Sequence, residues 1–389
     1  QNLLLLDYHI GRHSSIKLNK LETRVLCILR LGAFQLLFSD SIPESAAVNE
    51  TVALCRGKDR RSAGFVNAVL RALASVDDPY DINEKDHIKR ISIRYSHPEW
   101  ICRELVEMVG PDRAEEVLAA NNEAPPVTIQ VNTLMKSSRE VADALRDEGV
   151  DTAPHEIVPN CLNLQHTGAI DRLGAFRQGW FWVQDASSML AVMALDPKPG
   201  ERILDVCAAP GGKSFAAAVL SCGKAEITSL DISERKLKLV REGSERMGLG
   251  LRVGKADATV YDPEYDGKFD RIICDVPCSG LGIIRKKPDI RYMDRERADR
   301  LPELQLNILK NVSRYLKPGG LLLYSTCTWR DPENAGVVKR FLGENREFEL
   351  EGFELPQPLG HIDTGMITLW PQNFHFDGFF ICLMRKNNV

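Results

Sequence analysis

The segment from Glu201 to Ser214 constrains the fold of this chain more strongly than any other stretch. It reads ERILDVCAAPGGKS, and the Ala-rich run SFAAAVL begins at its last residue. An apolar run that ends in a Pro-Gly-Gly turn before such a stretch predicts a strand, a glycine loop and a helix in that order. Gly211 and Gly212 let the backbone approach a ligand closely, and the following helix offers free amide groups at its N-terminus. We therefore expect this loop to receive a cofactor.

The glycine loop differs from the common phosphate-binding motifs. A GxxxxGK[ST] loop needs a glycine at the position where this chain has Cys207. The spacing of the glycines does not match GxGxxG either. A ligand other than a nucleoside triphosphate is therefore favoured.

Acidic residues lie at or near the ends of four successive candidate strands, at Asp205, Asp231, Asp257 and Asp275. A single Asp after a strand is usually a helix cap or a turn former. Four acidic residues that each end a parallel strand would lie along one edge of the sheet, and open parallel sheets bind ligands at that edge. Asp231 follows the glycines by about twenty residues, where an acidic side chain can accept hydrogen bonds from ribose hydroxyls. The pattern favours a cofactor that contains a nucleoside.

Two cysteines follow candidate strands, Cys278 in DVPCSG and Cys327 in STCT. Most free cysteines are small buried hydrophobes, and either residue alone would be interpreted in that way. Methylation of carbon 5 of a pyrimidine, however, requires a thiolate that first adds to carbon 6. A second group near the ring is then useful when the carbon 5 proton leaves and the thiol is eliminated. A pair of cysteines fits this division of labour.

From about Phe181 to Lys386 the chain resembles the S-adenosylmethionine-dependent RNA cytosine-5 methyltransferases. The matching stretches, which also agree in order, are VQDASSM, DVCAAPGGKS, Asp231, Asp257, DVPCSG, KKPDIRY, KPGGLLLYSTCT and DGFF. The resemblance implies that Cys327 is the nucleophile, that Cys278 assists release of the methylated base, and that Asp275 contacts the cytosine edge. It implies S-adenosyl-L-methionine as the cofactor, bound by Cys207, Ala208, Ala209, Pro210, Gly211, Gly212, Lys213, Asp231, Arg235, Asp257 and Asp275.

Two features separate this chain from neighbouring methyltransferase classes. Enzymes that methylate exocyclic amines resemble one another in a [DNS]PP[FYW] loop, whereas here the loop is Asp-Val-Pro-Cys. DNA cytosine-5 enzymes use a Pro-Cys nucleophile without a Thr-Cys partner, so RNA is favoured. A carboxyl shielded from water can stay protonated and donate to ring nitrogen 3, and Asp275 is the candidate. Lys213 is either a solvated loop lysine or a site residue that lowers the pKa of a nearby thiol.

The N-terminal region, residues 1–122, is expected to form a helical bundle. LETRVLCILRLGAFQLLF places Val25, Leu29 and Phe34 on one apolar face. Together with FVNAVLRAL this region resembles the NusB-like RNA-binding bundle. A basic loop joins two of its helices and is either solvated or in contact with phosphates. Its candidate RNA-binding residues are Arg56, Lys58, Arg60 and Arg61.

Residues 123–179 are expected to form a small α+β module. VTIQVN, CLNLQ and GWFWVQD read as strands, and Ser137 with Glu140 forms a capping box that opens a helix between the first two. The module resembles the RNA-binding insert that precedes the catalytic domain in this family. Trp180, Phe181 and Trp182 are more often core residues at such spacing than base-stacking platforms.

Composition limits how the chain can bind RNA. The 389 residues carry a net charge of −4, so a general basic coat is excluded and binding must come from local patches. One such patch follows Cys278 and contains Arg285, Lys286, Lys287 and Arg291. The ten cysteines show no CxxC spacing, which indicates neither a metal site nor a disulfide framework and suits the cytoplasm. The apolar run NLLLL is too short to span a membrane.

The expected fold class is α/β: a Rossmann-like S-adenosylmethionine-dependent methyltransferase domain at residues 180–389, preceded by the α+β module and the all-α NusB-like bundle. This combination resembles the bacterial 16S ribosomal RNA cytosine-5 methyltransferases and implies a cytoplasmic, monomeric enzyme without a metal. Transfer RNA remains an alternative substrate. A non-catalytic factor that binds ribosomal RNA remains the alternative function.

Overall fold

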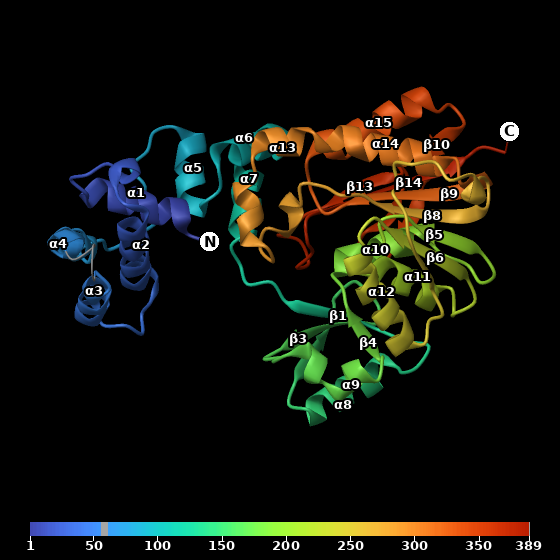
Figure 1. Cartoon of the computed structure of the whole chain (residues 1–389), viewed down its shortest axis with the longest axis horizontal. Coiled ribbons are helices and arrows are strands. Elements are labelled where there is room, and N and C mark those ends of the chain that lie inside the picture. Colours follow the sequence, from blue (N-terminus) through green and yellow to red (C-terminus); the bar gives the residue numbers. More distant parts are fainter. Residues whose placement is uncertain (56–60, 389) are drawn as a thin grey trace. The chain divides into compact units, whose positions relative to one another are not determined.

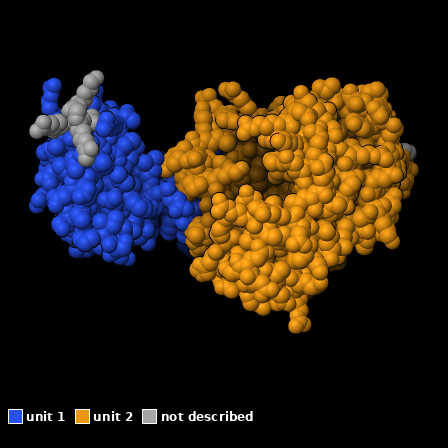
Figure 2. Space-filling model, turned by 60° about the horizontal axis from the view of Figure 1, so that its bottom comes forward, with its two compact units in different colours: residues 1–122 blue, residues 123–389 orange. Residues whose placement is uncertain are grey.

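The computed structural model describes residues 1–55 and 61–388. The chain divides into two compact units, residues 1–122 and residues 123–389, which Figure 2 colours separately. Figure 1 labels the helices and strands of each unit. In the described ranges, no helix is both long and apolar enough to cross a membrane.

The first unit is helical throughout its described secondary structure. Its helices are α1 (Leu3–His13), η1 (Leu18–Lys20), α2 (Thr23–Phe38), α3 (Glu44–Ala53), α4 (Ala63–Leu73), α5 (His87–Tyr95), α6 (Glu99–Val109) and α7 (Pro111–Ala120). The side chain of Asp86 caps α5 by accepting a hydrogen bond from the backbone amide of Lys89 at 2.8 Å. The helical bundle predicted from the apolar periodicity is confirmed.

Close packing of α2 against α3 and α4 builds the core of this unit. Val25 and Leu29 are buried, as the apolar periodicity predicts, but Phe34 is 45% exposed. A Cβ atom added to Gly32 would lie 2.8 Å from the Leu70 side chain and 2.9 Å from that of Thr51. A larger residue at position 32 would therefore force these buried side chains to shift.

A small antiparallel sheet begins the second unit. Its strand order is β2 (Asp151–Pro154), β3 (Cys161–Gln165), β1 (Val127–Val131) and β4 (Phe181–Val183), with α8 (Ser138–Asp147), η3 (Ile170–Arg172) and α9 (Gly174–Arg177) between the strands. Because β4 pairs with β1, this sheet extends past residue 179, where the sequence predicted the end of the module.

Local chemistry explains how this small module forms. The capping box is confirmed, since the Ser137 hydroxyl accepts from the Glu140 amide and the Glu140 carboxylate accepts from the Ser137 amide. Phe181 and Trp182 are buried, 0% and 3% exposed, which agrees with a core role for these two aromatic residues.

The large sheet has the strand order β10-β14-β9-β8-β5-β6-β7, and β13 pairs with β14 outside this path. The strands are β5 (Arg202–Asp205), β6 (Glu226–Asp231), β7 (Arg252–Lys255), β8 (Phe269–Asp275), β9 (Leu316–Thr326), β10 (Phe348–Leu350), β13 (Met366–Leu369) and β14 (Phe379–Lys386), and a separate hairpin joins β11 (Phe353–Leu355) and β12 (Gly360–Ile362). Strands β5 to β9 run parallel, and β14 is antiparallel to β9.

Helices cover both faces of this sheet (Figure 1). One face is covered by α10 (Ala186–Leu195), α11 (Gly212–Leu220) and α12 (Glu234–Met247), and the other by α14 (Leu301–Ser313) and α15 (Ala335–Glu344). The connecting segments contain α13 (Arg295–Asp299) and the short helices η4 (Pro263–Tyr265), η5 (Leu281–Ile283), η6 (Pro288–Tyr292) and η7 (Asp331–Glu333). Ile203 of β5 joins the core under α10, α11 and α12, whereas the next residue, Leu204, joins the core under α14 and α15. Strand order reverses between β5 and β8, and ligands bind at such a switch point in doubly wound sheets. The predicted Rossmann-like fold is confirmed.

The packing at Gly32 generates a prediction about stability. Gly32→Ala should destabilise the protein by about 1–3 kcal/mol, because the added methyl group overlaps Leu70 and Thr51. Gly64→Ala, where an added Cβ meets nothing within 4 Å, is the matched control and should be neutral or stabilising by up to about 1 kcal/mol. Thermal unfolding measures both effects. Equal midpoints for the two variants would show that the close approach at Gly32 is wrong.

Candidate active site

A cavity of about 440 Å³ opens where β5, β8 and β9 end, and the surface of the second unit is visibly hollowed in Figure 2. Several residues that the sequence predicted for cofactor binding or catalysis line this cavity, namely Cys207, Ala208, Ala209, Pro210, Gly212, Lys213, Asp275 and Cys327. The candidate RNA-binding residues Lys286 and Lys287 line it as well. Residues that the sequence did not single out complete the wall, among them Asp185, Ser188, Ile283 and Phe379.

The glycine loop has a backbone that only glycine adopts readily. Gly211 caps α11 with a φ of 115°, and a Cβ atom there would lie 2.3 Å from the Phe215 ring. A Cβ atom on Gly212 would lie 3.3 Å from Gln184, which lines the cavity. The loop therefore brings bare backbone and the N-terminus of α11 to the cavity.

Lys213 and Asp275 form an ion pair in the cavity wall. Lys213 Nζ donates to Asp275 Oδ2 at 2.7 Å and to Ser188 Oγ at 2.8 Å, and it lies 5.0 Å from the centre of the Phe379 ring. Ser325 Oγ donates to Asp275 Oδ1 at 2.7 Å. The Lys213 side chain is only 9% exposed, so it is not a solvated loop lysine. The Asp275 side chain is 31% exposed and is therefore not the water-shielded carboxyl that the sequence suggested.

The carboxyl that the fold does shield is that of Asp205, which is 1% exposed. Burial raises its pKa to about 7, and the nearby Asp275 carboxylate also raises it. Asp205 Oδ2 accepts from Ser214 Oγ at 2.7 Å, whereas Oδ1 has no hydrogen-bond partner among the described residues. Because buried polar atoms are nearly always hydrogen-bonded, this oxygen in the cavity wall indicates a position for a ligand donor.

The two predicted cysteines lie together. Cys278 Sγ is 3.2 Å from Cys327 Sγ, and Cys327 alone of the two lines the cavity. The hydrogen bond to Cys327, followed by burial, raises the pKa of the Cys278 thiol well above its ordinary value. Cys278 is therefore held as a neutral thiol that can donate to the neighbouring sulfur.

The remaining cofactor candidates lie outside the cavity wall. Asp231 is 8% exposed, and its carboxylate accepts from the Ala209 amide at 3.2 Å and from the Ser233 amide at 2.9 Å. The exposed Asp257 accepts two hydrogen bonds from Thr259, which lower its pKa.

Two residues of the segment after β6 are exposed outside the cavity. Arg235 is exposed on α12 and does not line the cavity, so the geometry adds no support for its predicted contact. Ile232, directly after Asp231, is 61% exposed and does not line the cavity either.

The basic patch after Cys278 needs correction. Arg285 is 3% exposed and Arg291 is 0% exposed, so neither guanidinium is open to a phosphate. Arg285 Nε donates to Asp377 Oδ1 at 3.1 Å, and Arg291 Nε donates to the Pro288 carbonyl at 3.2 Å. Lys287 is exposed.

In the N-terminal basic loop, Arg61 is exposed. The candidates Arg56, Lys58 and Arg60 lie outside the described residues. No group of three or more His, Cys, Asp or Glu side chains that could hold a metal ion occurs in the ranges 1–55 and 61–388.

Comparisons with known proteins agree with this architecture. Residues 1–75 match the NusB family, residues 97–171 match the ferredoxin-like domain of RsmF/B-like methyltransferases, and residues 192–385 match the 16S rRNA methyltransferase RsmB/F family. The probable ribosomal RNA small subunit methyltransferase B of Bacillus subtilis is 36% identical over 395 residues, which cover 99% of this chain and 88% of the relative.

Solved structures share the fold. The crystal structure of PH0851 matches with a TM-score of 0.81 at 27% identity, covering 99% of this chain and 87% of that one. NSun6 from Pyrococcus horikoshii, solved with the S-adenosylmethionine analogue SFG, matches with a TM-score of 0.65 at 21% identity over 74% of this chain and 98% of that one, and this likeness concerns the fold alone. The arrangement of the domains and the matches along the whole chain lead to one conclusion: this chain belongs to the 16S rRNA methyltransferase RsmB/F family.

Proposed function

We propose that this chain methylates carbon 5 of one cytidine in 16S ribosomal RNA, with S-adenosylmethionine as methyl donor and Cys327 as the nucleophile. The observation that carries the proposal is the pair of sulfurs, 3.2 Å apart, of which that of Cys327 belongs to the cavity wall. Relatives named ribosomal RNA small subunit methyltransferase B, in Bacillus subtilis and Vibrio cholerae, support the ribosomal substrate.

The residues at the glycine loop fit S-adenosylmethionine. Gly212 brings bare backbone to the cavity, and the unpartnered oxygen of Asp205 can accept a hydrogen bond from an ammonium group. Asp231 would accept from the ribose hydroxyls, and Asp257 would lie near the adenine. When bound, the cofactor supplies the methyl group.

The first chemical step is attack by the Cys327 thiolate on carbon 6 of the cytosine ring. This addition makes carbon 5 nucleophilic, which the aromatic ring alone does not achieve. The neutral Cys278 thiol can donate a hydrogen bond to the attacking sulfur and so stabilise the thiolate. The ion pair of Lys213 and Asp275 offers a donor and an acceptor to the polar edge of the base.

Release of the product requires loss of the carbon 5 proton and elimination of Cys327. The contact with Cys327 is the largest cause of the raised pKa of Cys278. Once the Cys327 sulfur is bonded to carbon, that contact no longer holds the proton on Cys278. After it has released its own proton to water, the Cys278 thiolate can accept the carbon 5 proton, while the double bond between carbons 5 and 6 re-forms and Cys327 leaves as a thiolate.

Binding of the RNA would rest on local cations, because the net charge of the chain is −4. Lys287 at the cavity and Arg61 in the N-terminal unit are the exposed candidates among the described residues. Each would contribute a phosphate contact whose strength depends on salt.

Transfer of label tests the proposed function directly. Unmodified 16S ribosomal RNA, incubated with the protein and methyl-labelled cofactor, should yield labelled 5-methylcytidine on nucleoside analysis. Unmodified transfer RNA serves as the comparison substrate and should accept much less label. A non-catalytic assembly factor would transfer none, and label on transfer RNA alone would contradict the ribosomal substrate.

The fate of the adduct separates the roles of the two cysteines. Cys327→Ala should abolish both methyl transfer and any covalent complex, because the attacking thiolate is gone. Cys278→Ala should accumulate a denaturation-resistant complex with RNA in the presence of cofactor, because elimination is slowed. Gel electrophoresis under denaturing conditions measures both. The reverse pattern would assign the nucleophile to Cys278.

A third experiment tests the cofactor pocket. Asp231→Ala should weaken binding of S-adenosylmethionine by about 1.5–3 kcal/mol, the size of hydrogen bonds to a charged group. Asp257→Ala serves as a second variant and tests the proposed adenine side of the pocket. Calorimetry gives the dissociation constants. An unchanged constant in a folded Asp231 variant would remove this residue from the pocket.

A further inference from the structure

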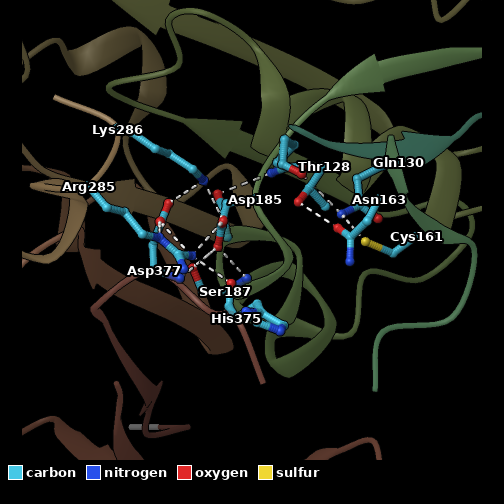
Figure 3. Close-up of polar contacts among 12 residues, drawn as sticks. Thr128, Gln130, Cys161, Asn163, Asp185, Ser187, Arg285, Lys286, His375 and Asp377 are labelled. Atoms are coloured by element: carbon cyan, nitrogen blue, oxygen red, sulfur yellow. Dashed lines mark hydrogen bonds and ion pairs between the residues drawn. The ribbon is translucent and has the colours of Figure 1, made fainter. Parts of the chain in front are cut away.

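Four charged side chains form a cluster at the wall of the cavity, which Asp185, Lys286 and Asp377 line (Figure 3). Lys286 Nζ lies 2.5 Å from Asp185 Oδ2 and 2.6 Å from Asp377 Oδ2, so one ammonium group is shared by two carboxylates. Arg285 lies 3.1 Å from Asp377 and 4.0 Å from Asp185. The side chains of Arg285 and Asp377 are 1% and 4% exposed, and that of Asp185 is 10% exposed.

The cluster joins three segments that are far apart in the sequence. Asp185 caps α10, since its Oδ1 accepts from the Ser187 amide at 2.9 Å. Lys286 belongs to the segment that follows Cys278, and Asp377 belongs to the segment before β14. Arg285 also donates to the carbonyl of His375 at 2.6 Å, and His375 has a φ of 55° that non-glycine residues rarely adopt. The cluster thus holds a strained turn in place.

Backbone contacts continue from this cluster to the proposed nucleophile. The Gly378 amide donates to the Gly282 carbonyl at 2.8 Å, and the Gly282 amide donates to the Cys327 carbonyl at 3.0 Å. A Cβ atom on Gly282 would lie 1.8 Å from the Gly378 carbonyl oxygen, so the two segments touch through bare backbone. The segment 280–287 is therefore seated directly against Cys327.

The cluster is also connected to the ion pair of Lys213 and Asp275. Helix α10 starts at the cap formed by Asp185, and its first turn carries Ser188, which accepts from Lys213 at 2.8 Å. Lys213 in turn contacts Asp275. A displaced α10 N-terminus would therefore move a hydrogen-bond partner of the site.

The charges of the cluster are matched internally. Two cations face two carboxyl groups, and Lys286 has a side chain only 28% exposed. Burial would raise the pKa of Asp185, but Lys286 and the hydrogen bonds lower it well below its ordinary value. Burial and Asp185 together raise the pKa of Asp377 to about 7, against the opposing effect of Lys286 and Arg285. The Lys286 ammonium is thus already engaged, whereas Lys287 is exposed beside it.

We propose that Lys286 is a positioning residue: with Asp185 and Asp377 it seats the segment 280–287 against Cys327, and it is not a ligand of RNA phosphates. This inference rests on the proposed function, because the reaction that it supports is methyl transfer at Cys327. Lys287, its neighbour, is the phosphate contact of this segment.

Steady-state kinetics of two adjacent variants test the inference. Lys286→Met should lower kcat about tenfold or more, since small misplacements of reacting groups have effects of this size, and leave the salt dependence of RNA binding unchanged. Lys287→Met should act mainly on KM for RNA and flatten the log-log salt slope by about 0.7–0.9. Lys286→Arg, which keeps a cation between the two carboxylates, should recover part of the lost kcat.

A third variant keeps the test decisive if Lys286→Met does not fold. Asp377→Asn should reproduce the loss of kcat with an unchanged salt slope, and its affinity for S-adenosylmethionine should stay within about twofold of the unaltered protein. When Lys286→Met and Asp377→Asn are combined, the two losses of kcat should not add, because both changes remove the same contact.

The outcomes separate the inference from the proposed function. A flattened salt slope with normal kcat in Lys286→Met would make Lys286 a phosphate ligand and overturn the inference alone. Normal kcat in both Lys286→Met and Asp377→Asn would also overturn it. Absence of methyl transfer by the unaltered protein would overturn the proposed function and the inference with it.

Discussion

The parallel pairing of β8 with β9 is the constraint on which the site depends. Its register sets Asp275 opposite Ser325, and the Ser325 hydroxyl donates to the Asp275 carboxylate at 2.7 Å. The segments that leave these two strand ends therefore start side by side. Cys278 and Cys327 follow within a few residues, and this is why their sulfurs meet at 3.2 Å. A register shift of one residue would turn alternate side chains to the opposite face and separate the pair.

Strand ends and glycine loops were predictable from the sequence because their signals are local. The Pro-Gly-Gly turn, the acidic residue after each apolar run and the two cysteine motifs all lie within a few residues of the structure that they specify. Parallel strands then bring their carboxyl ends to one edge of the sheet, so Asp205, Asp275 and Cys327 line one cavity. The core of the site follows from this rule.

The errors concern side chains whose partners are distant in the sequence. A local charge count assigned Arg285 to phosphates, but its carboxylate partner, Asp377, is 92 residues away. Long-range contacts also decide which of the two carboxyl groups, that of Asp205 or that of Asp275, is shielded from water. Asp275 meets Lys213 at the cavity wall, whereas Asp205 is enclosed at 1% exposure. Burial and long-range partners are not visible in residue spacing, so these assignments required the folded structure.

Identification of the sulfur that bonds to RNA tests the central claim most directly. RNA transcribed with 5-fluorocytidine in place of cytidine carries a fluorine that cannot leave carbon 5 as a proton does, so the methylated adduct should be arrested. Mass spectrometry of the digested complex then identifies the modified peptide. The account predicts a nucleotide attached to Cys327 and formed only when S-adenosylmethionine is present. A nucleotide attached to Cys278, or none attached while methyl transfer to ordinary RNA proceeds, would contradict it.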